Sequence, residues 1–267
     1  MRTAIDSIHL AYDDQGTGPP VLFVHAFPLD RRMWAAQLNA LGAAYRCIVP
    51  DLRGFGQSDV AGPFSMERYA DDLAALLDAL WVRQPVVLVG LSLGGYIAFA
   101  FWRRHRSRVR GLVLADTRPG ADSAEGMERR RKTIATAREG GAGAVADLLA
   151  DGMMSARTRQ RHPERLAQLR QMMADAPVEG IVGACEAMMA RPDSTPLLES
   201  IDVPTLVVVG EDDATTPPSE ARRMHAAIPA SRLEEIPGAG HLSNLERPAA
   251  FNCVLVDWLQ QIERSGK

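Results

Sequence analysis

The chain has 267 residues, of which 46% are hydrophobic and 24% are charged, an ordinary composition for a globular protein with a sizeable buried core. Its formal net charge of −3 gives no sign of nucleic acid or an anionic membrane as a partner. No stretch approaches the ~20 apolar residues that span a bilayer, and residues 1–6 lack the apolar run of a signal peptide. We therefore expect a cytoplasmic protein, in which Cys47, Cys185 and Cys253 are buried reduced thiols.

Short apolar runs recur along the chain and are typical of strands in a parallel sheet that is covered on both faces. Residues 1–13, in which apolar residues alternate, predict an antiparallel edge. Further strands are expected at Val21–Phe27, Cys47–Pro50, Val86–Gly90, Leu112–Ala115, Thr205–Gly210 and Arg232–Ile236.

Helical patterns separate these strands. Ser65 is a good N-cap for a helix that has Tyr69 and Leu73 at helical spacing. Pro248 suits the first turn of a last helix, which contains Phe251 and Trp258. Strands that alternate with helices predict a doubly wound α/β sheet.

The alternation stops between about Arg118 and Leu198. This stretch has a helical composition, no convincing strand, and seven of the 11 methionines of the chain. We interpret residues 118–198 as a helical cap inserted into one α/β core domain, which is formed by residues 1–117 and 199–267. The methionines either fill gaps between helices or line an adaptable apolar pocket.

The most informative stretch is Gly90-Leu91-Ser92-Leu93-Gly94, which lies between a strand pattern and a helix pattern. This is the arrangement of a nucleophile elbow. The turn leaves no room for a side chain two positions before or after the serine. Both of these positions are glycine here. The hydroxyl group is then exposed beside a helix amino terminus, which stabilises negative charge. Ser92 is therefore the predicted nucleophile.

A serine hydroxyl needs a base that removes its proton. Among six histidines, His241 lies in a loop after a predicted strand, and Gly238 and Gly240 allow that loop to present the side chain. His241 is therefore the predicted general base.

The base in turn needs a carboxylate that fixes its tautomer and stabilises the imidazolium ion. Glu211, Asp212 and Asp213 all follow the carboxyl end of the strand expected at Thr205–Gly210. Their position alone leaves open which of these three carboxylates is the acid.

The transition state also needs hydrogen-bond donors for its oxyanion. One is expected to be the backbone N–H of Leu93, directly after the nucleophile. The second is expected to be the N–H of Phe27, in the loop after an early strand. His25 lies in the same loop, and we expect it to brace the loop without taking part in the reaction.

Two other kinds of site find no support. The stretch Asp51–Asp59 has neither the spacing of a dinucleotide-binding loop nor a Walker lysine, so we interpret it as an ordered turn held by Asp51, Arg53 and Asp59. No group of histidine and carboxylate residues has the spacing of metal ligands. We therefore expect no metal.

Five motifs together resemble the α/β-hydrolase superfamily. They are His-x-Phe-Pro at 25–28, Asp-x-Arg-Gly-x-Gly-x-Ser at 51–58, the elbow at 90–94, Gly-x-x-Asp at 210–213 and Gly-His at 240–241. The order serine, acid, histidine is also that of the superfamily. Its Gly-x-x-Asp spacing selects Asp213 over Asp212. Within the superfamily, residues 90–95 and 241–246 look like the 3-oxoadipate enol-lactonase and small carboxylesterase group.

The resemblance implies a mostly parallel eight-stranded sheet with helices on both faces, a helical cap, no cofactor, and a small-molecule ester or lactone as substrate. One departure concerns the oxyanion loop. The superfamily usually has His-Gly where this chain has His25-Ala26, and a methyl group there can narrow the loop or change its backbone angles.

We therefore predict a serine hydrolase that forms an acyl-enzyme intermediate through Ser92, His241 and Asp213. Cofactor-free perhydrolases and carbon–carbon bond hydrolases use the same three residue types and are alternatives. A non-catalytic small-molecule receptor on the same fold is a third alternative. Arginines of the cap, such as Arg118 and Arg130, leave a carboxylated lactone open as substrate, although a solvated helix face is the simpler interpretation.

Overall fold

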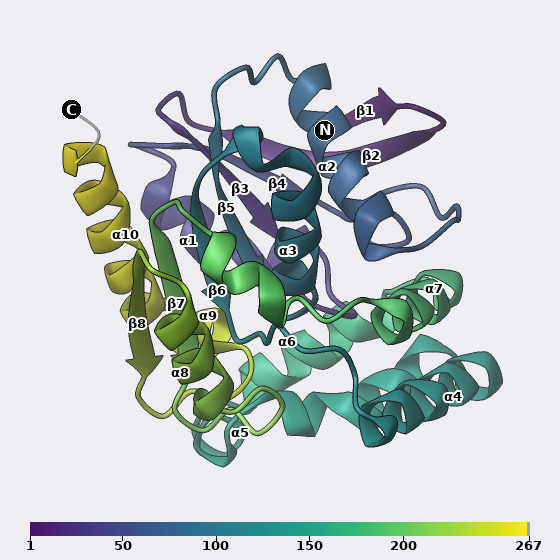
Figure 1. The fold of residues 1–267 in the computed structure, drawn as a ribbon. Coiled ribbons are helices and arrows are strands. Elements are labelled where there is room, and N and C mark those ends of the chain that lie inside the picture. The colour runs from purple at the N-terminus through teal and green to yellow at the C-terminus, as the bar shows by residue number, and fades with distance from the viewer. Residues whose placement is uncertain (266–267) are drawn as a thin grey trace.

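The computed structural model describes residues 1–265 and contains an eight-stranded sheet in the order β1-β2-β4-β3-β5-β6-β7-β8 (Figure 1). β2 pairs antiparallel with both β1 and β4, and every other pairing is parallel. The predicted mostly parallel eight-stranded sheet with an antiparallel edge is thus confirmed. The strands are β1 (Arg2–Ile5), β2 (Ile8–Gln15), β3 (Pro20–Val24), β4 (Arg46–Pro50), β5 (Val86–Leu91), β6 (Val109–Ala115), β7 (Thr205–Gly210) and β8 (Ser231–Ile236).

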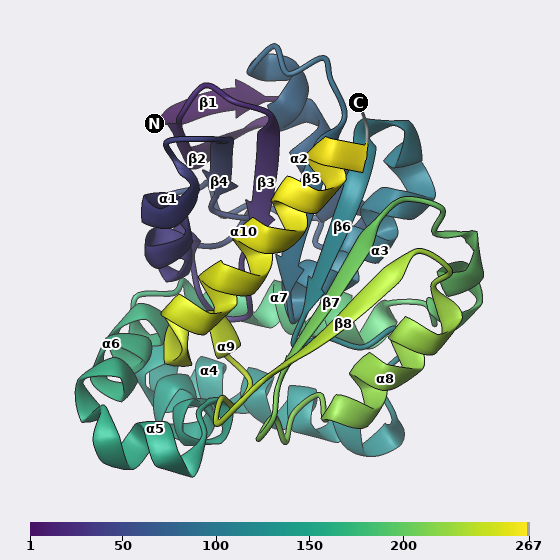
Figure 2. The same ribbon diagram turned by 90° about the vertical axis from the view of Figure 1, so that its left-hand side faces the viewer.

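Helices cover both faces of the sheet, as Figure 2 shows. α1 (Ala35–Leu41) and α10 (Pro248–Ser265) pack on one face, and α2 (Met66–Ala79), α3 (Leu93–His105) and α8 (Pro218–Ala227) pack on the other. Each face has its own hydrophobic core, and successive residues of a strand alternate between the two. In β3, Val21 and Phe23 belong to one core while Leu22 and Val24 belong to the other.

Local signals in the sequence explain where helices begin. The Ser65 hydroxyl accepts a hydrogen bond from the Arg68 N–H at 3.0 Å, which confirms Ser65 as the N-cap of α2. Pro248 is the first residue of α10, as predicted. The same helix corrects one expectation, because Cys253 is exposed whereas Cys47 and Cys185 are buried. Helical periodicity turns position 253 to solvent, while Phe251 and Leu255 face the core.

The predicted strand Val21–Phe27 is too long, because β3 ends at Val24. The chain turns directly afterwards, and the Leu29 N–H donates to the Ala26 carbonyl oxygen at 2.9 Å. Pro28 has no N–H with which to continue a ladder. His25, Ala26 and Phe27 therefore lie in a loop at the carboxyl end of the strand.

Between β6 and β7 the described chain forms helices and no strand, in agreement with the composition of this segment. Figures 1 and 2 show these helices together at one end of the sheet. They are α4 (Ala124–Leu149), α5 (Ala156–Arg161), α6 (Pro163–Ala174) and α7 (Val178–Ala190). The remaining helical turns are η1 (Arg31–Trp34), η2 (Arg106–Arg108), η3 (Ala150–Met153), η4 (Thr195–Ser200) and α9 (Ser243–Glu246).

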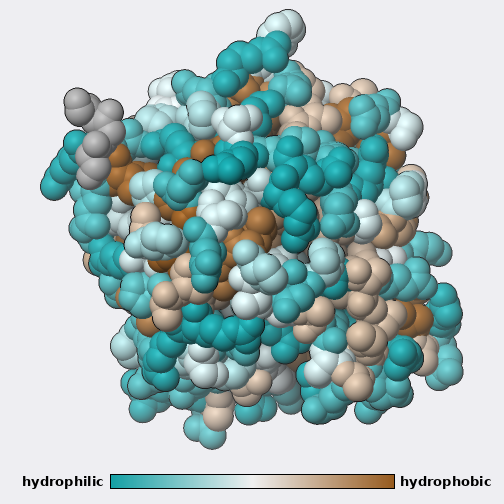
Figure 3. Space-filling model, viewed as in Figure 1, coloured by the Kyte–Doolittle hydropathy of each residue, from teal (hydrophilic) through white to brown (hydrophobic). Residues whose placement is uncertain are grey.

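The surface is predominantly polar on the face shown in Figure 3, where hydrophobic residues form only small separate areas. Within residues 1–265, no helix combines the length and the apolar character needed to cross a membrane.

Candidate active site

Ser92 occupies the turn between β5 and α3. Its backbone angles are φ 54° and ψ −108°, a region that is costly for a residue with a side chain. A Cβ atom on Gly90 would lie 2.2 Å from the Gly94 carbonyl oxygen, and one on Gly94 would lie 2.2 Å from the Val24 carbonyl oxygen. The turn therefore requires glycine at both positions, as the elbow pattern predicts.

The structure brings Ser92, His241 and Asp213 together from the loops after β5, β8 and β7. The Ser92 Oγ lies 2.9 Å from His241 Nε2, and His241 Nδ1 lies 2.9 Å from Asp213 Oδ2. A carboxylate only accepts hydrogen bonds, so the Nδ1–H donates to Asp213 and Nε2 accepts the Ser92 hydroxyl proton. This is the hydrogen-bond chain that a general base needs in order to activate a serine.

Asp213 is buried, whereas Asp212 and Glu211 are exposed. Its Oδ1 accepts the N–H groups of Thr215 and Thr216 at 2.8 and 3.0 Å, and its Oδ2 accepts the Thr216 hydroxyl at 2.7 Å. Burial raises the pKa of the Asp213 carboxyl, but the charge of His241 and these donors outweigh burial, so the pKa lies below its ordinary value. Asp213 is therefore held as a carboxylate.

Sequence analysis missed Thr216. A threonine three residues after an aspartate in a loop can cap that aspartate, and this spacing is the signal that could have identified it.

His241 is 2% exposed and lies among charged groups. Burial lowers the pKa of its imidazole, but the Asp213 and Asp116 carboxyls outweigh burial and the opposing charge of Arg130. The pKa of His241 therefore lies above its ordinary value, as a carboxylate partner requires.

The loop that presents His241 is fixed by the buried carboxylate of Glu246. Its Oε1 accepts the Gly240 N–H at 2.8 Å, and its Oε2 accepts the Ser155 N–H at 2.9 Å. Glu246 thus joins the histidine loop to the helical segment between β6 and β7. In the sequence, Glu246 stood out only as part of residues 241–246, which resemble the family, and nothing indicated this role.

The two predicted oxyanion donors belong to residues near Ser92. Leu93 is the first residue of α3, so its N–H has no partner within the helix. Phe27 lines the same pocket as Ser92 and His241. His25 braces the Phe27 loop, as expected, because its Nε2 accepts the Leu52 N–H at 3.0 Å and its Nδ1 lies 3.0 Å from the Ala26 carbonyl oxygen.

Ala26 does not strain this loop. The non-glycine residues with positive φ within the described chain are Asp6, Trp81, Ser92 and Asp116, and Ala26 is not among them. Its methyl group is fully buried, and its N–H donates to the Met33 sulfur at 3.2 Å. The departure from His-Gly is therefore accommodated by packing, with ordinary backbone angles at position 26.

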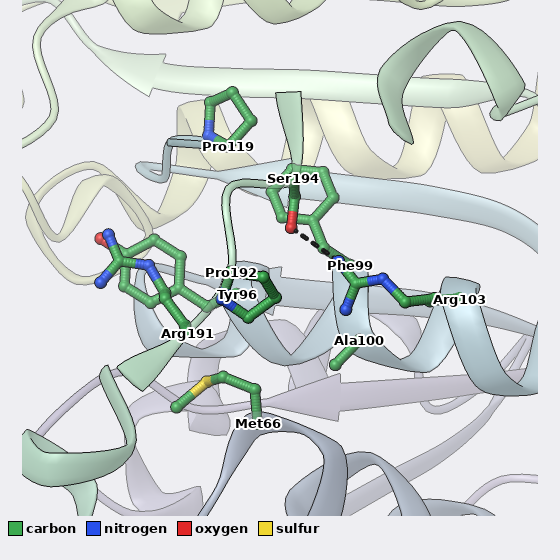
Figure 4. A pocket seen from close by; sticks show the side chains of 9 residues that line it. All are labelled: Met66, Tyr96, Phe99, Ala100, Arg103, Pro119, Arg191, Pro192 and Ser194. Carbon is green, nitrogen blue, oxygen red and sulfur yellow. Dashed lines mark hydrogen bonds between the residues drawn. The ribbon is translucent and has the colours of Figure 1, made fainter. Parts of the chain in front are cut away.

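A pocket of about 350 Å³ opens above Ser92 and His241. Met153, Met188 and Leu149 of the helical segment line it, so some methionines of this segment face the pocket while others, such as Met173, are buried in the core. A second cavity shares Tyr96 with the pocket but measures only about 10 Å³, enough for no more than one water molecule (Figure 4).

One wall of the pocket is positively charged. Asp122, whose side chain is buried, lies 2.8 Å from Arg118, 3.3 Å from Arg130 and 3.0 Å from Arg191. One carboxylate therefore faces three guanidinium groups. Arg191 stacks on the Tyr96 ring at 4.0 Å (Figure 4), while Arg118 and Arg130 line the pocket.

The solvated helix face expected for the arginines is wrong for Arg118 and Arg130, whose side chains are only 22% and 23% exposed. Both are turned inward by Asp122. Within residues 1–265, no group of three or more His, Cys, Asp or Glu side chains is arranged to hold a metal ion.

Comparisons with known proteins agree with this architecture. A family model described as "alpha/beta hydrolase fold" matches residues 19–248. A thermophilic esterase from Thermogutta terrifontis, solved with malate bound, is 45% identical, with a TM-score of 0.95 over 98% of this chain and 99% of that one. The 3-oxoadipate enol-lactonase 1 of Acinetobacter baylyi is 30% identical over 92% of this chain and 90% of its own.

A non-heme chloroperoxidase of Kitasatospora aureofaciens is also similar, with 31% identity over 90% of each chain. The esterase and enol-lactonase relatives agree with the predicted carboxylic ester hydrolase, and the resemblance stated from the motifs is confirmed. The family model, the similar proteins and the elbow geometry lead to one conclusion: the chain belongs to the α/β-hydrolase fold family.

Proposed function

We propose that this protein is a serine hydrolase that cleaves a carboxylic ester or lactone, with Ser92 as nucleophile, His241 as general base and Asp213 as the acid. The proposal rests on one observation, the hydrogen-bond chain from Ser92 Oγ through His241 to Asp213 at the floor of a pocket. The similarity to an esterase and to an enol-lactonase supports it.

The reaction has two steps. His241 Nε2 takes the Ser92 proton while Oγ attacks the carbonyl carbon, and the imidazolium then protonates the leaving alkoxide. Water, activated by the neutral imidazole, then attacks the acyl-enzyme and releases the acid. Asp213 stays ionised and stabilises the imidazolium in both steps. The N–H groups of Phe27 and Leu93 stabilise the oxyanion of each tetrahedral intermediate.

We further propose that residues 118–198 form a cap over the core domain of residues 1–117 and 199–267. Pocket residues come from both parts, since Ser92 and His241 belong to the core while Arg130 and Met188 belong to the proposed cap. In this arrangement, side chains of the cap determine which substrate binds, and side chains of the core carry out the reaction.

The pocket favours a substrate with a carboxylate in addition to its ester group. Arg118 and Arg130 line the wall, and Asp122 neutralises only one of the three guanidinium groups around it. An anionic group on the substrate would balance this excess. The malate bound to the similar esterase is itself an anion with carboxylate groups, which agrees with the proposal.

The test is hydrolysis of p-nitrophenyl butyrate by the wild type and by Ser92→Ala, measured side by side. We expect turnover by the wild type and a loss of several orders of magnitude in the variant. Equal activity in both proteins would refute Ser92 as the nucleophile.

Perhydrolysis is a second candidate, favoured by the 31% identity to a chloroperoxidase. In that reaction hydrogen peroxide replaces water as the group that attacks the acyl-enzyme, and the product is a peroxy acid. Halide oxidation that requires both peroxide and a carboxylic acid, and that disappears in Ser92→Ala, would support it.

A further inference from the structure

The end of β6 contacts the nucleophile turn directly. The Ser92 N–H donates to the Ala115 carbonyl oxygen at 3.0 Å, and the Thr117 hydroxyl donates to the Ser92 carbonyl oxygen at 2.9 Å. Between these two residues lies Asp116, whose N–H donates to the Val208 carbonyl oxygen on β7 at 2.9 Å. This short segment thus holds both the N–H and the carbonyl group of Ser92.

The side chain of Asp116 reaches the other two loops of the proposed triad. Its Oδ1 accepts the N–H of Gly210, three residues before Asp213, at 2.8 Å. Its Oδ2 accepts the hydroxyl and the N–H of Ser243, two residues after His241, at 2.5 and 3.2 Å. One carboxyl group therefore joins the strand end before the acid to the helix start after the base.

The position of Asp116 is energetically unfavourable in two respects. The residue is fully buried, and its φ of 44° is unusual for a residue with a side chain. A buried carboxyl group is unfavourable unless hydrogen bonds compensate for its lost hydration. Here the compensating donors all belong to the elements that present Asp213 and His241, since the hydrogen bonds come from Gly210 and Ser243.

Two titratable groups face Asp116, Asp213 on the loop after β7 and His241 on the loop after β8. Burial raises the pKa of the Asp116 carboxyl, the Asp213 charge raises it further, and it lies well above its ordinary value. The Asp116 charge in turn raises the pKa of His241. Because a carboxyl group with a raised pKa ionises only toward alkaline pH, Asp116 acts on His241 at lower pH mainly through the hydrogen bonds to its loop.

We propose that Asp116 is a positioning residue of the triad, which ties the His241 and Asp213 loops together. This inference rests on the proposed serine hydrolase function. Asparagine at this position offers only one carboxamide oxygen, so it leaves either Gly210 or Ser243 without its acceptor.

The test compares Asp116→Asn and Ser243→Ala with the wild type in p-nitrophenyl butyrate hydrolysis. For Asp116→Asn we expect kcat to fall about 10- to 100-fold, as small displacements of reacting groups do, with KM within about twofold. The acid limb of the kcat/KM profile should stay in place, because the raised pKa leaves the Asp116 carboxyl mostly uncharged where His241 titrates. Ser243→Ala should cause a smaller fall in kcat, and the double variant should show less than the product of the two effects.

Asp72→Asn is the matched control, since Asp72 is also a buried carboxyl group, but its ion pairs are with Arg53 and Arg68, outside the triad loops. It should lower the melting temperature without lowering kcat. Folding of each variant is checked by circular dichroism. An Asp116→Asn protein that folds but keeps the wild-type kcat would overturn the proposal.

If Asp116→Asn does not fold, Ser243→Ala decides, and an unchanged kcat would overturn the proposal equally. Failure of the proposed function itself would look different. In that case Ser92→Ala would retain wild-type activity, whatever the result at position 116.

Discussion

The charged wall of the pocket leads to a prediction about substrate choice. Replacing Arg130 by Met keeps much of the side-chain volume but removes a guanidinium group that is 23% exposed and lies 5.9 Å from the centre of the Phe27 ring. Phe27 is a proposed oxyanion donor, so the ester group of a bound substrate would lie near Phe27. A carboxylate elsewhere on the same substrate can then reach the Arg130 guanidinium group. The variant should lose its preference for substrates with that carboxylate.

The size of the effect follows from Coulomb's law. Two unit charges ~4 Å apart in an effective dielectric of ~20 attract by about 4 kcal/mol. Part of the Arg130 charge is already compensated by Asp122, and solvent screens the remainder, so we expect about 1–2 kcal/mol. That corresponds to roughly 5- to 30-fold in kcat/KM.

The assay compares the p-nitrophenyl monoester of glutarate with p-nitrophenyl valerate, which have acyl chains of equal carbon number. Only the ratio of their kcat/KM values is used, because Arg130 also lowers the pKa of His241 and its loss affects both esters alike. The ratio of kcat/KM for the glutarate ester to that for the valerate ester should fall in Arg130→Met and fall less in Arg130→Lys. For the wild type it should decrease in high salt.

Arg131→Met is the matched control. Arg131 is the next residue of α4, is 62% exposed and pairs with Glu128, away from the pocket. Its ratio should equal that of the wild type. An unchanged ratio in Arg130→Met would refute the idea that this wall selects a carboxylate, even if both esters were hydrolysed more slowly.

Three further predictions concern the triad. Because carboxyl groups raise the pKa of His241, the kcat/KM for p-nitrophenyl butyrate should increase with pH through a pKa above 6.5, and a flat profile from pH 5 to 8 would exclude His241 as the base. Gly94→Ala should cost about 10²-fold in kcat/KM and lower the melting temperature, since its Cβ would lie 2.2 Å from the Val24 carbonyl oxygen; wild-type values would contradict the elbow geometry. Thr216→Val removes a hydroxyl donor of Asp213, worth about 1.5–3 kcal/mol, which a urea unfolding curve should register; an unchanged midpoint would mean that the hydroxyl contributes nothing.

Much of the fold could be predicted because its signals are local. The apolar runs that became β5 and β7 are bounded by glycine or a turn, and the helix after Ser65 begins with a hydroxyl cap. The end of β3 could not be predicted in this way. Ala26 and Phe27 continue the apolar character of the strand, and only the turn from Ala26 to Leu29 ends the ladder.

The residues of the candidate site also differ in whether a local sequence pattern identifies them. Ser92 could be predicted because the tight turn around it forces glycine at two fixed positions, which leaves a mark in the sequence. Asp116 and Glu246 left no such mark, since each acts on groups that are distant in the chain, whereas Thr216 is marked only by its place three residues after Asp213. Asp116 is 127 residues from Ser243, and Glu246 is 91 residues from Ser155.

The three groups share one physical feature, a hydrogen bond to a loop that presents a triad residue. Thr216 holds the Asp213 carboxylate, Glu246 holds the Gly240 N–H beside His241, and Asp116 connects both loops. Two of them are buried carboxyl groups, which are costly unless their donors are fixed. The energetic cost of burying these two carboxyl groups is therefore offset only when the proposed triad is assembled. This favours the assembled conformation over less ordered ones. The elbow positions the proposed nucleophile through local backbone geometry, whereas the proposed base and acid depend on this buried polar network, which sequence patterns alone do not reveal.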